Sequence, residues 1–314
     1  MRIRFRGIDV RETVLFRGPS GWGEFGPFPE YADPEACRWL AAGLESAWGT
    51  WPAPVRDRVE INATVPAVGP GHVAGVLEGF DGCRTVKVKV AEAGQTLHDD
   101  LARVAEVRAL LGPGGQIKVD ANGAWTVEQA REALTRLSAY SLQYAEQPCA
   151  EVAELAELRR LLARDGVDVP IAADESVRRA EDPVRVAREG AADLVVVKVA
   201  PLGGVASALR IVAECGLPAV VSSAIDTSVG IAAGVALAAA LPELDHACGL
   251  GTVGLLDADV AERPLVPAAG VITVEDALAV VRADEQPGLA GRELTGERRD
   301  WWLDRLARCH ALLT

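Results

Sequence analysis

From residue 83 onward, the chain alternates between short runs rich in β-branched residues and longer segments with helical character. Strands separated by helices cannot pair as hairpins, so this alternation predicts parallel strands in one sheet. Seven or so such units are enough to close the sheet into a barrel. An open doubly wound sheet is the alternative, but no Gly-x-Gly-x-x-Gly follows an early strand. The expected strands are 83–90, 116–120, 142–146, 168–173, 193–199, 218–223 and 246–250, with helices between them that include 97–111, 127–137, 152–163 and 205–213.

The two ends of the chain do not share this alternation. Residues 1–82 are expected to form a small α+β unit. Its stretch 18–31 is rich in Gly, Pro and aromatic residues, which predicts a loop, either a lid over a site or a loop packed on its own domain. Residues 281–314 are expected to pack back on the first unit. Within the first unit we expect a strand marked by Ile3, Phe5 and Ile8, a second at 14–16, a helix at 34–48 and a third strand at 59–65.

Lysine occurs at only four positions, although arginine is frequent. Lys87 and Lys89 lie two residues apart in a valine-rich strand, so their side chains share one face. Burying two ammonium groups together is costly, and both burial and the neighbouring charge are expected to lower their pKa values. A lysine with a lowered pKa can serve as a general base, which arginine cannot. The alternative is codon bias that leaves lysines at strand ends by chance.

Three consecutive expected strands end in an acidic residue, namely Asp120, Glu146 and Asp174. In a barrel, these strand ends converge on one mouth. Three carboxylates there would repel one another unless a cation neutralised them, and oxygen ligands suit Mg²⁺, with Mn²⁺ as a substitute. A single acid at a strand end is often only a helix cap, but three in register favour a metal site. Glu175 competes with Asp174 as a ligand, and Asn122 lies close to the set.

Lys198 ends the next expected strand, so the three acids are flanked by Lys89 before them and Lys198 after them around the rim. This order suits removal of a proton next to a carboxylate, because a divalent ion stabilises the enediolate that forms. Lys118 is expected to point inward, deeper in the barrel, with a structural role.

Lys-x-Lys, Asp-Ala-Asn-Gly-Ala-Trp, Glu-Gln-Pro, Ala-Asp-Glu-Ser and the later strand lysine resemble the muconate-lactonizing subgroup of the enolase superfamily. The resemblance covers nearly the whole chain. It implies an α/β fold, a modified (β/α)7β TIM-type barrel with an α+β capping domain built from the N-terminus and the C-terminal segment. The implied units are 1–82 for the cap, 83–280 for the barrel and 281–314 for the returning segment.

The same resemblance implies roles for the site residues. Lys89 and Lys198 would be the acid/base lysines, and Lys87 would tune Lys89. Relatives often carry Arg where this chain has Lys118, which is a small departure from the pattern. The implied Mg²⁺ ligands are Asp120, Glu146 and Asp174.

Three features resemble the o-succinylbenzoate synthase family within this subgroup: the short chain, the stretch 21–28 followed by Tyr31, and the segment 222–230. This implies a Mg²⁺-dependent syn-dehydration of 2-succinyl-6-hydroxy-2,4-cyclohexadiene-1-carboxylate in menaquinone biosynthesis. Lys89 would remove the proton and then assist loss of the hydroxyl, while Lys198 would stay cationic. Backbone NH groups near Ser222 and Ser223 would hold the succinyl carboxylate, with Asn122 as a further candidate contact.

Other activities stay open. N-succinylamino acid racemases and dipeptide epimerases use the same framework, and for the latter Asp257 and Asp259 are candidates for binding the substrate amine. A muconate cycloisomerase is another possibility within the subgroup. From a different class, a non-catalytic binding protein could keep the barrel, but every expected catalytic position is filled.

Composition narrows the partners. The net charge of −13 argues against nucleic acid and anionic membrane surfaces. The charged N-terminal stretch is unlike a signal peptide, and the longest apolar run, 229–241, is too short to span a bilayer. Six scattered cysteines without a Cys-x-x-Cys pair suit reduced thiols. We therefore expect a cytoplasmic enzyme with a small-molecule carboxylate substrate, either a monomer or a homo-oligomer.

Overall fold

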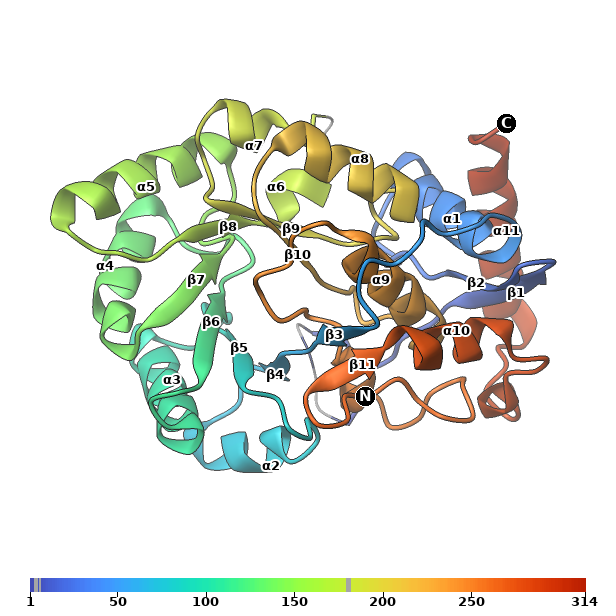
Figure 1. The fold of residues 1–314 in the computed structure, drawn as a ribbon, viewed down its shortest axis with the longest axis horizontal. Coiled ribbons are helices and arrows are strands. Elements are labelled where there is room, and N and C mark those ends of the chain that lie inside the picture. Colours follow the sequence, from blue (N-terminus) through green and yellow to red (C-terminus); the bar gives the residue numbers. More distant parts are fainter. Residues whose placement is uncertain (3–4, 6, 179–181) are drawn as a thin grey trace.

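Parallel strands form the centre of the molecule, and helices surround them (Figure 1). The computed structural model describes residues 1–2, 5, 7–178 and 182–314. Seven parallel strands are hydrogen-bonded in the order β10-β9-β8-β7-β6-β5-β4. They are β4 (Ala63–Val65), β5 (Thr85–Lys89), β6 (Gln116–Asp120), β7 (Leu142–Glu146), β8 (Ile171–Ala173), β9 (Leu194–Val197) and β10 (Ala219–Val221).

Residues 246–250, which we call the closing segment, complete the circle through isolated bridges. On one side the Gly249 amide donates to the Val221 carbonyl, at 2.8 Å. On the other side the Asn62 amide donates to the Cys248 carbonyl at 2.9 Å, beside β4. The sheet is therefore closed, which confirms the modified (β/α)7β barrel and excludes the open doubly wound sheet.

Several helices between the strands bury one face, whereas α9 (Ser228–Ala240) is buried on nearly every side. In α4, for example, Ala130, Ala133, Leu134 and Leu137 follow the helical repeat and are fully buried. The helix begins after Thr126, which forms a capping box with Gln129. The barrel helices are α2 (Val73–Leu77), α3 (Leu97–Leu111), α4 (Val127–Leu137), α5 (Val152–Asp165), α6 (Glu175–Arg178), α7 (Arg185–Arg188), α8 (Val205–Cys215) and α9 (Ser228–Ala240), with single 3₁₀ turns at Pro70–His72, Ser138–Tyr140, Thr252–Leu255 and Pro287–Leu289.

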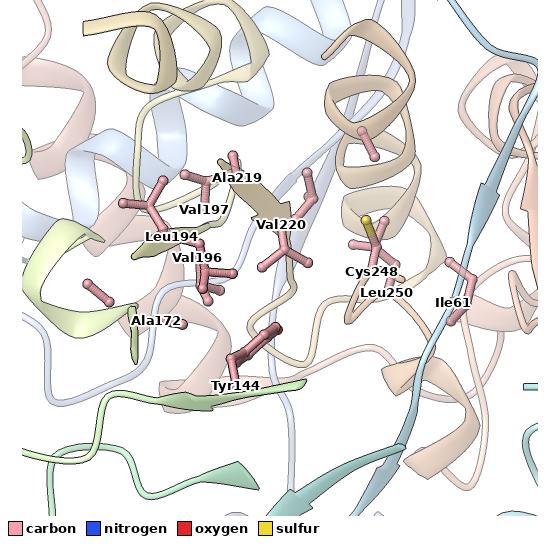
Figure 2. Close-up of a cluster of buried hydrophobic side chains, with 14 of the residues drawn as sticks. Ile61, Tyr144, Ala172, Leu194, Val196, Val197, Ala219, Val220, Cys248 and Leu250 are labelled. Atoms are coloured by element: carbon pink, nitrogen blue, oxygen red, sulfur yellow. The ribbon is translucent and has the colours of Figure 1, made fainter. Parts of the chain in front are cut away.

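An apolar layer fills the barrel interior beneath the strand ends. Tyr144, Val196 and Val220 come from three different strands and lie around one space with Cys248 of the closing segment (Figure 2). Side chains two residues apart share a face of a strand, so the residues two positions later point to the same interior, one layer higher. For these strands the later residues are Glu146, Lys198 and Ser222. The apolar layer is thus the floor on which the polar residues stand.

Lys118 lies in this floor and is fully buried, deeper than the acids as expected. Its Nζ donates to the Ala247 carbonyl at 2.5 Å and to Asn62 Oδ1 at 3.3 Å, and it lies 4.9 Å from the Tyr144 ring centre. Burial lowers the pKa of Lys118 to about 7. The side chain therefore links β6 across the interior to the closing segment.

The capping region combines both ends of the chain (Figure 1). β1 (Val14–Gly18) and β2 (Gly21–Phe25) form an antiparallel hairpin against α1 (Asp33–Trp48), and β3 (Arg58–Glu60) pairs with β11 (Val271–Thr273). α10 (Val274–Arg282) and α11 (Gly296–Ala311) follow. Trp302 and Cys309 of α11 share a buried cluster with Phe25, Trp39 and Tyr31, so the C-terminal segment packs back on the cap.

Three local predictions need correction or qualification. Residues 21–25 are a strand, not a loop; glycine is needed at Gly23 because a Cβ there would clash with the Gly43 carbonyl of α1. The strand expected at 59–65 is two strands, and the second, β4, belongs to the barrel sheet. Of the first expected strand, Ile3 lies outside the described residues, while Phe5 and Ile8 pair with each other in an isolated antiparallel bridge. The domain boundaries at 82 and 280 stay predictions.

No helix in the described parts of the chain is long and apolar enough to cross a membrane.

Candidate active site

The strand register places the charged residues at one level of the barrel. Lys89 is the partner of Asp120 on the next strand, and Asp120 is the partner of Glu146 on the one after. Asp174 follows β8, and Lys198 directly follows β9. A pocket of about 210 Å³ opens at these strand ends. Its lining includes Lys87, Lys89, Lys198, Asn122, Glu175, Arg178, Ser222 and Ser223.

Every one of the three acids is bound by a lysine. Lys87 Nζ lies 3.0 Å from Glu146 Oε1 and 3.3 Å from Asp120 Oδ2. Lys89 Nζ donates to Asp120 as well, and to Asn122 Oδ1 at 2.8 Å. Asp174 Oδ2 accepts from Lys198 Nζ at 2.5 Å. These ion pairs are almost wholly buried. Removing the charges from water therefore costs much free energy, and the attraction between the paired charges offsets much of that cost.

The pKa shifts follow from this crowding. Burial, followed by the negative charge of Asp120, raises the pKa of Glu146 to about 7. Burial alone would lower the pKa of Lys87, but the carboxylates of Glu146 and Asp120 outweigh it and the pKa is raised. The prediction of a lowered pKa is thus wrong for Lys87, because the nearby acids decide the balance. The pKa of Asp174 is lowered against the effect of burial by Lys198 and Arg178.

The next question is whether the three acids are suited to binding a divalent metal ion. Among the residues that the structure describes, no group of acidic, histidine or cysteine side chains is already gathered as a metal site, and each of the three acids is hydrogen-bonded to a lysine. Their donor chemistry nevertheless fits a divalent ion: the charges of Asp120 and Asp174 both act on Glu146. Nearby, Glu175 Oε2 is buried without a hydrogen-bond partner. Asp120, Glu146 and Asp174 therefore remain the predicted ligands.

Two side chains beside the acids were not singled out from the sequence as site residues. Gln147 accepts from the amides of Asp174 and Ser176, at 2.9 and 3.2 Å, and so fixes the turn that carries Asp174. Its place directly after Glu146 in the Glu-Gln-Pro motif is the signal that could have found it. Arg178 contacts both Asp174 and Glu175, but no motif marks it beyond its position one helical turn after Asp174.

The predicted substrate contacts reach the same pocket. Ser222, Ser223 and Asn122 all line it, although their contact with a substrate stays a prediction. The Ser222 amide already donates to the Val197 carbonyl at 2.9 Å, and Ser223 Oγ bonds the Gly249 carbonyl at 2.8 Å. Of the two amides proposed for a substrate carboxylate, that of Ser222 is thus occupied by the barrel's own hydrogen bonding.

Asp257 and Asp259, the candidates for binding a dipeptide amine, point to structural partners. Asp257 forms an ion pair with the N-terminal amine at 3.2 Å, and Asp259 accepts from the Ser228 amide at 3.0 Å. Neither residue lines the pocket. The structure therefore gives the dipeptide interpretation no support from this pair.

Glu24 of β2 joins the cap to the start of α9, outside the lining of the pocket. It accepts hydrogen bonds from Thr227 Oγ1 at 2.7 Å and from the Gly230 amide at 2.8 Å, at the start of α9. Burial, followed by the negative charge of Asp226, raises the pKa of Glu24 to about 7. The cap and the barrel are therefore joined through a carboxyl group that titrates near neutral pH.

This pKa predicts a pH-dependent stability. Because the folded protein holds the Glu24 proton more tightly than the unfolded chain, the stabilisation is complete below the unfolded pKa and is lost as pH rises through about 7. Between pH 5 and 7.5 we expect Glu24 to account for a decrease of about 2 kcal/mol in the free energy of unfolding. Urea unfolding of the wild type and Glu24→Gln at both pH values measures it. An equal pH dependence in the two proteins would show that Glu24 is ionised throughout.

Two family descriptions match the chain. Residues 74–290 match the family described as enolase C-terminal domain-like, and residues 1–47 match the one described as enolase N-terminal domain-like. The first match alone spans more than half of the chain and includes every lysine and acid of the site.

Sequence relatives extend over almost the whole chain. An o-succinylbenzoate synthase of Thermobifida fusca is 56% identical over 96% of this chain and 94% of its own length. An o-succinylbenzoate synthase of Mycolicibacterium smegmatis is 57% identical over 100% of this chain and 94% of its own length.

Solved structures agree in fold at lower identity. The L-Ala-D/L-Glu epimerase of Bacillus subtilis has a TM-score of 0.69 at 23% identity, covering 83% of this chain and 87% of its own. The muconate lactonizing enzyme of Pseudomonas putida has a TM-score of 0.68 at 21% identity, covering 86% and 93%. These two likenesses support the architecture of barrel and cap, and nothing about substrate.

Proposed function

The chain belongs to the enolase superfamily, and from that premise we propose that it is an o-succinylbenzoate synthase. The reaction is the syn-dehydration of 2-succinyl-6-hydroxy-2,4-cyclohexadiene-1-carboxylate in menaquinone biosynthesis, a carbon–oxygen lyase reaction. The observation that carries the proposal is the 56–57% identity to relatives of that name over nearly the full length of both chains. The site supports it, because three lysines line the pocket and each of them donates a hydrogen bond to one of the three acids.

Lys89 is the proposed base. Its Nζ, held by Asp120 and Asn122, faces the pocket from the end of β5. In its neutral form it takes the proton from the ring carbon that bears the carboxylate. The electrons of that C–H bond move into the carboxylate, which gives an enediolate. They then form the new ring double bond as the C–O bond breaks, and Lys89 returns the proton to the leaving hydroxyl. Water and the aromatic product result, and Lys89 is neutral again.

The other lysines provide fixed positive charge. Lys198 enters the pocket from the end of β9, across from Lys89, and its ion pair with Asp174 keeps it oriented. As an ammonium group it stabilises the negative charge that develops on the substrate. Lys87 pairs with Glu146 and is held protonated, since its pKa is raised by the carboxylates around it. Its charge adjusts the field at Lys89, which agrees with a tuning role.

Asp120, Glu146 and Asp174 are the residues that would hold the divalent ion, which we propose is Mg²⁺ with Mn²⁺ as a substitute. When bound there, the ion supplies positive charge to the substrate carboxylate oxygens as the proton leaves. Six free cysteines support a reducing compartment, so we propose that the enzyme works in the cytoplasm.

Turnover of the cyclohexadiene carboxylate, followed by ultraviolet absorbance, tests the function and the metal together. We expect o-succinylbenzoate to form with Mg²⁺ present, to stop forming after chelation, and to form again when Mg²⁺ or Mn²⁺ is added back. A folded protein that shows no turnover with either ion would contradict the synthase proposal, and turnover that survives chelation would contradict the metal.

One observation keeps a racemase activity as the second candidate. Lys89 and Lys198 line the same pocket from different strands, as proton exchange on both faces of an α-carbon requires. Incubating N-succinylamino acids in heavy water separates the two activities. Exchange of the α-proton with racemisation would favour the racemase, whereas a slow or absent exchange beside fast dehydration favours the synthase.

A further inference from the structure

Arg178 joins three groups that come from different parts of the molecule. Its guanidinium donates to Asp174 Oδ1 at 3.1 Å, to Glu175 Oε1 at 2.7 Å and to Tyr31 Oη at 2.9 Å. The first two partners lie four and three residues earlier: Asp174 directly precedes the one-turn helix α6, and Glu175 is its first residue. The third belongs to the cap. Arg178 itself is only 9% exposed and lines the pocket, so these bonds form away from bulk water.

On the barrel side, Arg178 completes the fixation of Asp174. Lys198 binds one carboxylate oxygen of Asp174 at 2.5 Å, and Arg178 binds the other. A carboxylate held at both oxygens cannot rotate without breaking a charged hydrogen bond. Glu175 is oriented from two sides as well, because Asn122 Nδ2 donates to the same Oε1 at 3.0 Å, and Asn122 in turn accepts from Lys89. Arg178 therefore acts on the acids and, through Asn122, on the chain of contacts to Lys89.

On the cap side, Tyr31 is firmly held. Its ring lies 5.4 Å from that of Phe28 and 6.2 Å from that of Trp39, and its carbonyl accepts from Arg305 of α11. A displacement of the capping segment would thus carry the Tyr31 hydroxyl with it. Since that hydroxyl bonds Arg178 directly, the position of the cap and the orientation of Asp174 are linked through one side chain.

We infer that Arg178 is a positioning residue that makes the metal-binding geometry of Asp174 depend on the closed position of the cap, with Tyr31 as the contact that reports it. The inference rests on the proposed function for its kinetic consequence only. Outer partners of a metal ligand typically alter affinity or activity by 10- to 100-fold, roughly the scale expected here. Substrate that holds the cap closed would thereby also complete the acid set.

The experiment measures Mn²⁺ binding to the metal-free protein by calorimetry, without substrate, and then kcat and KM for the cyclohexadiene carboxylate. Arg178→Met should weaken Mn²⁺ binding by about tenfold. The fold should persist, because Asp174 keeps Lys198 and Glu175 keeps Asn122. Arg178→Lys, which cannot reach three partners at once, should recover part of the loss. Arg185→Met, which removes an exposed pair with Glu189, is the matched control and should bind Mn²⁺ as the wild type does.

Tyr31→Phe distinguishes a link to the cap from a local effect. Alone, it should weaken Mn²⁺ binding less than Arg178→Met does, and it should raise KM more than it lowers kcat. In the Arg178→Met background, Tyr31→Phe should cause no further change in Mn²⁺ affinity or in KM, because the hydrogen bond between the two residues is already lost. Wild-type Mn²⁺ affinity in Arg178→Met, or fully additive effects in the double variant, would overturn the inference. If no variant turns the substrate over, the proposed function fails, and the Mn²⁺ series still decides the role of Arg178.

Discussion

Replacing Lys89 with alanine should lower kcat by about 10³-fold, within the range that a lost general base usually costs. Lys89 is buried at the pocket, and its Nζ is held by Asp120 and Asn122 at the level of the acids. Truncation should leave the fold intact, since Asp120 keeps its second ion pair with Lys87 at 3.3 Å. Turnover of the cyclohexadiene carboxylate and the thermal unfolding midpoint, measured together, test both statements.

Two controls distinguish a role of Lys89 as a general base from a role as a fixed positive charge. Lys89→Arg keeps the positive charge but cannot be deprotonated at working pH, so it should be as inactive as Lys89→Ala. Both variants should still bind Mn²⁺ in the absence of substrate. If Lys89→Arg retained more than about a tenth of the wild-type kcat, an effect well short of what a lost base costs, the residue would serve by its charge and the proton would be taken by another group.

Trp302→Ala should destabilise the protein by about 3–5 kcal/mol, the usual cost of removing a buried tryptophan. Trp302 is 2% exposed, packs edge-to-face on Phe25 at 6.0 Å between ring centres, and donates through its indole NH to Glu12 at 3.0 Å. Alanine leaves a cavity between α11 and the hairpin of the cap. Urea unfolding at constant pH measures the loss.

Leu303→Ala is the matched control on the same helix. Leu303 is 43% exposed, so its removal should cost less than about 1 kcal/mol, as surface substitutions usually do. Equal losses in the two variants would mean that destabilisation follows from weakening α11 itself. A small loss in Trp302→Ala would show that the C-terminal segment contributes little to the stability of the cap.

The layer of charged residues at the strand ends could be predicted because it depends on strand periodicity alone. Once Lys87, Asp120 and Glu146 are placed on neighbouring parallel strands, alternation fixes which side chains face the interior and at what height. The barrel followed in the same way from the strand–helix rhythm. Both inferences use local patterns that nothing else in the chain overrides.

The parts that were missed depend on contacts between distant segments. β2 was hidden because its glycines, which usually indicate a loop, let two helices approach the strand, α10 at Gly21 and α1 at Gly23. β4 was assigned to the cap because a strand of three residues is too short to show the strand–helix alternation of the barrel. Only its pairing with β5 shows that it belongs to the barrel sheet. The pKa of Lys87 could not be predicted from two neighbouring lysines, since the carboxylates that raise it come from other strands. The hydrogen bond between Arg178 and Tyr31 could not be predicted either, because it joins the barrel to the cap across a long stretch of sequence.

The closing segment has a consequence for the order of folding. Its two neighbours are β10, a short distance back along the chain, and the residues around Ile61, which were synthesised long before. Without the closing segment, the sheet would stay open with exposed edges at β4 and β10, and Lys118 would lose its hydrogen bond to the Ala247 carbonyl. Joining strands so far apart in sequence is intrinsically slow. The nascent chain is therefore most vulnerable to aggregation just before its last barrel segment arrives, and a chain that stops short of that segment should depend most on chaperones.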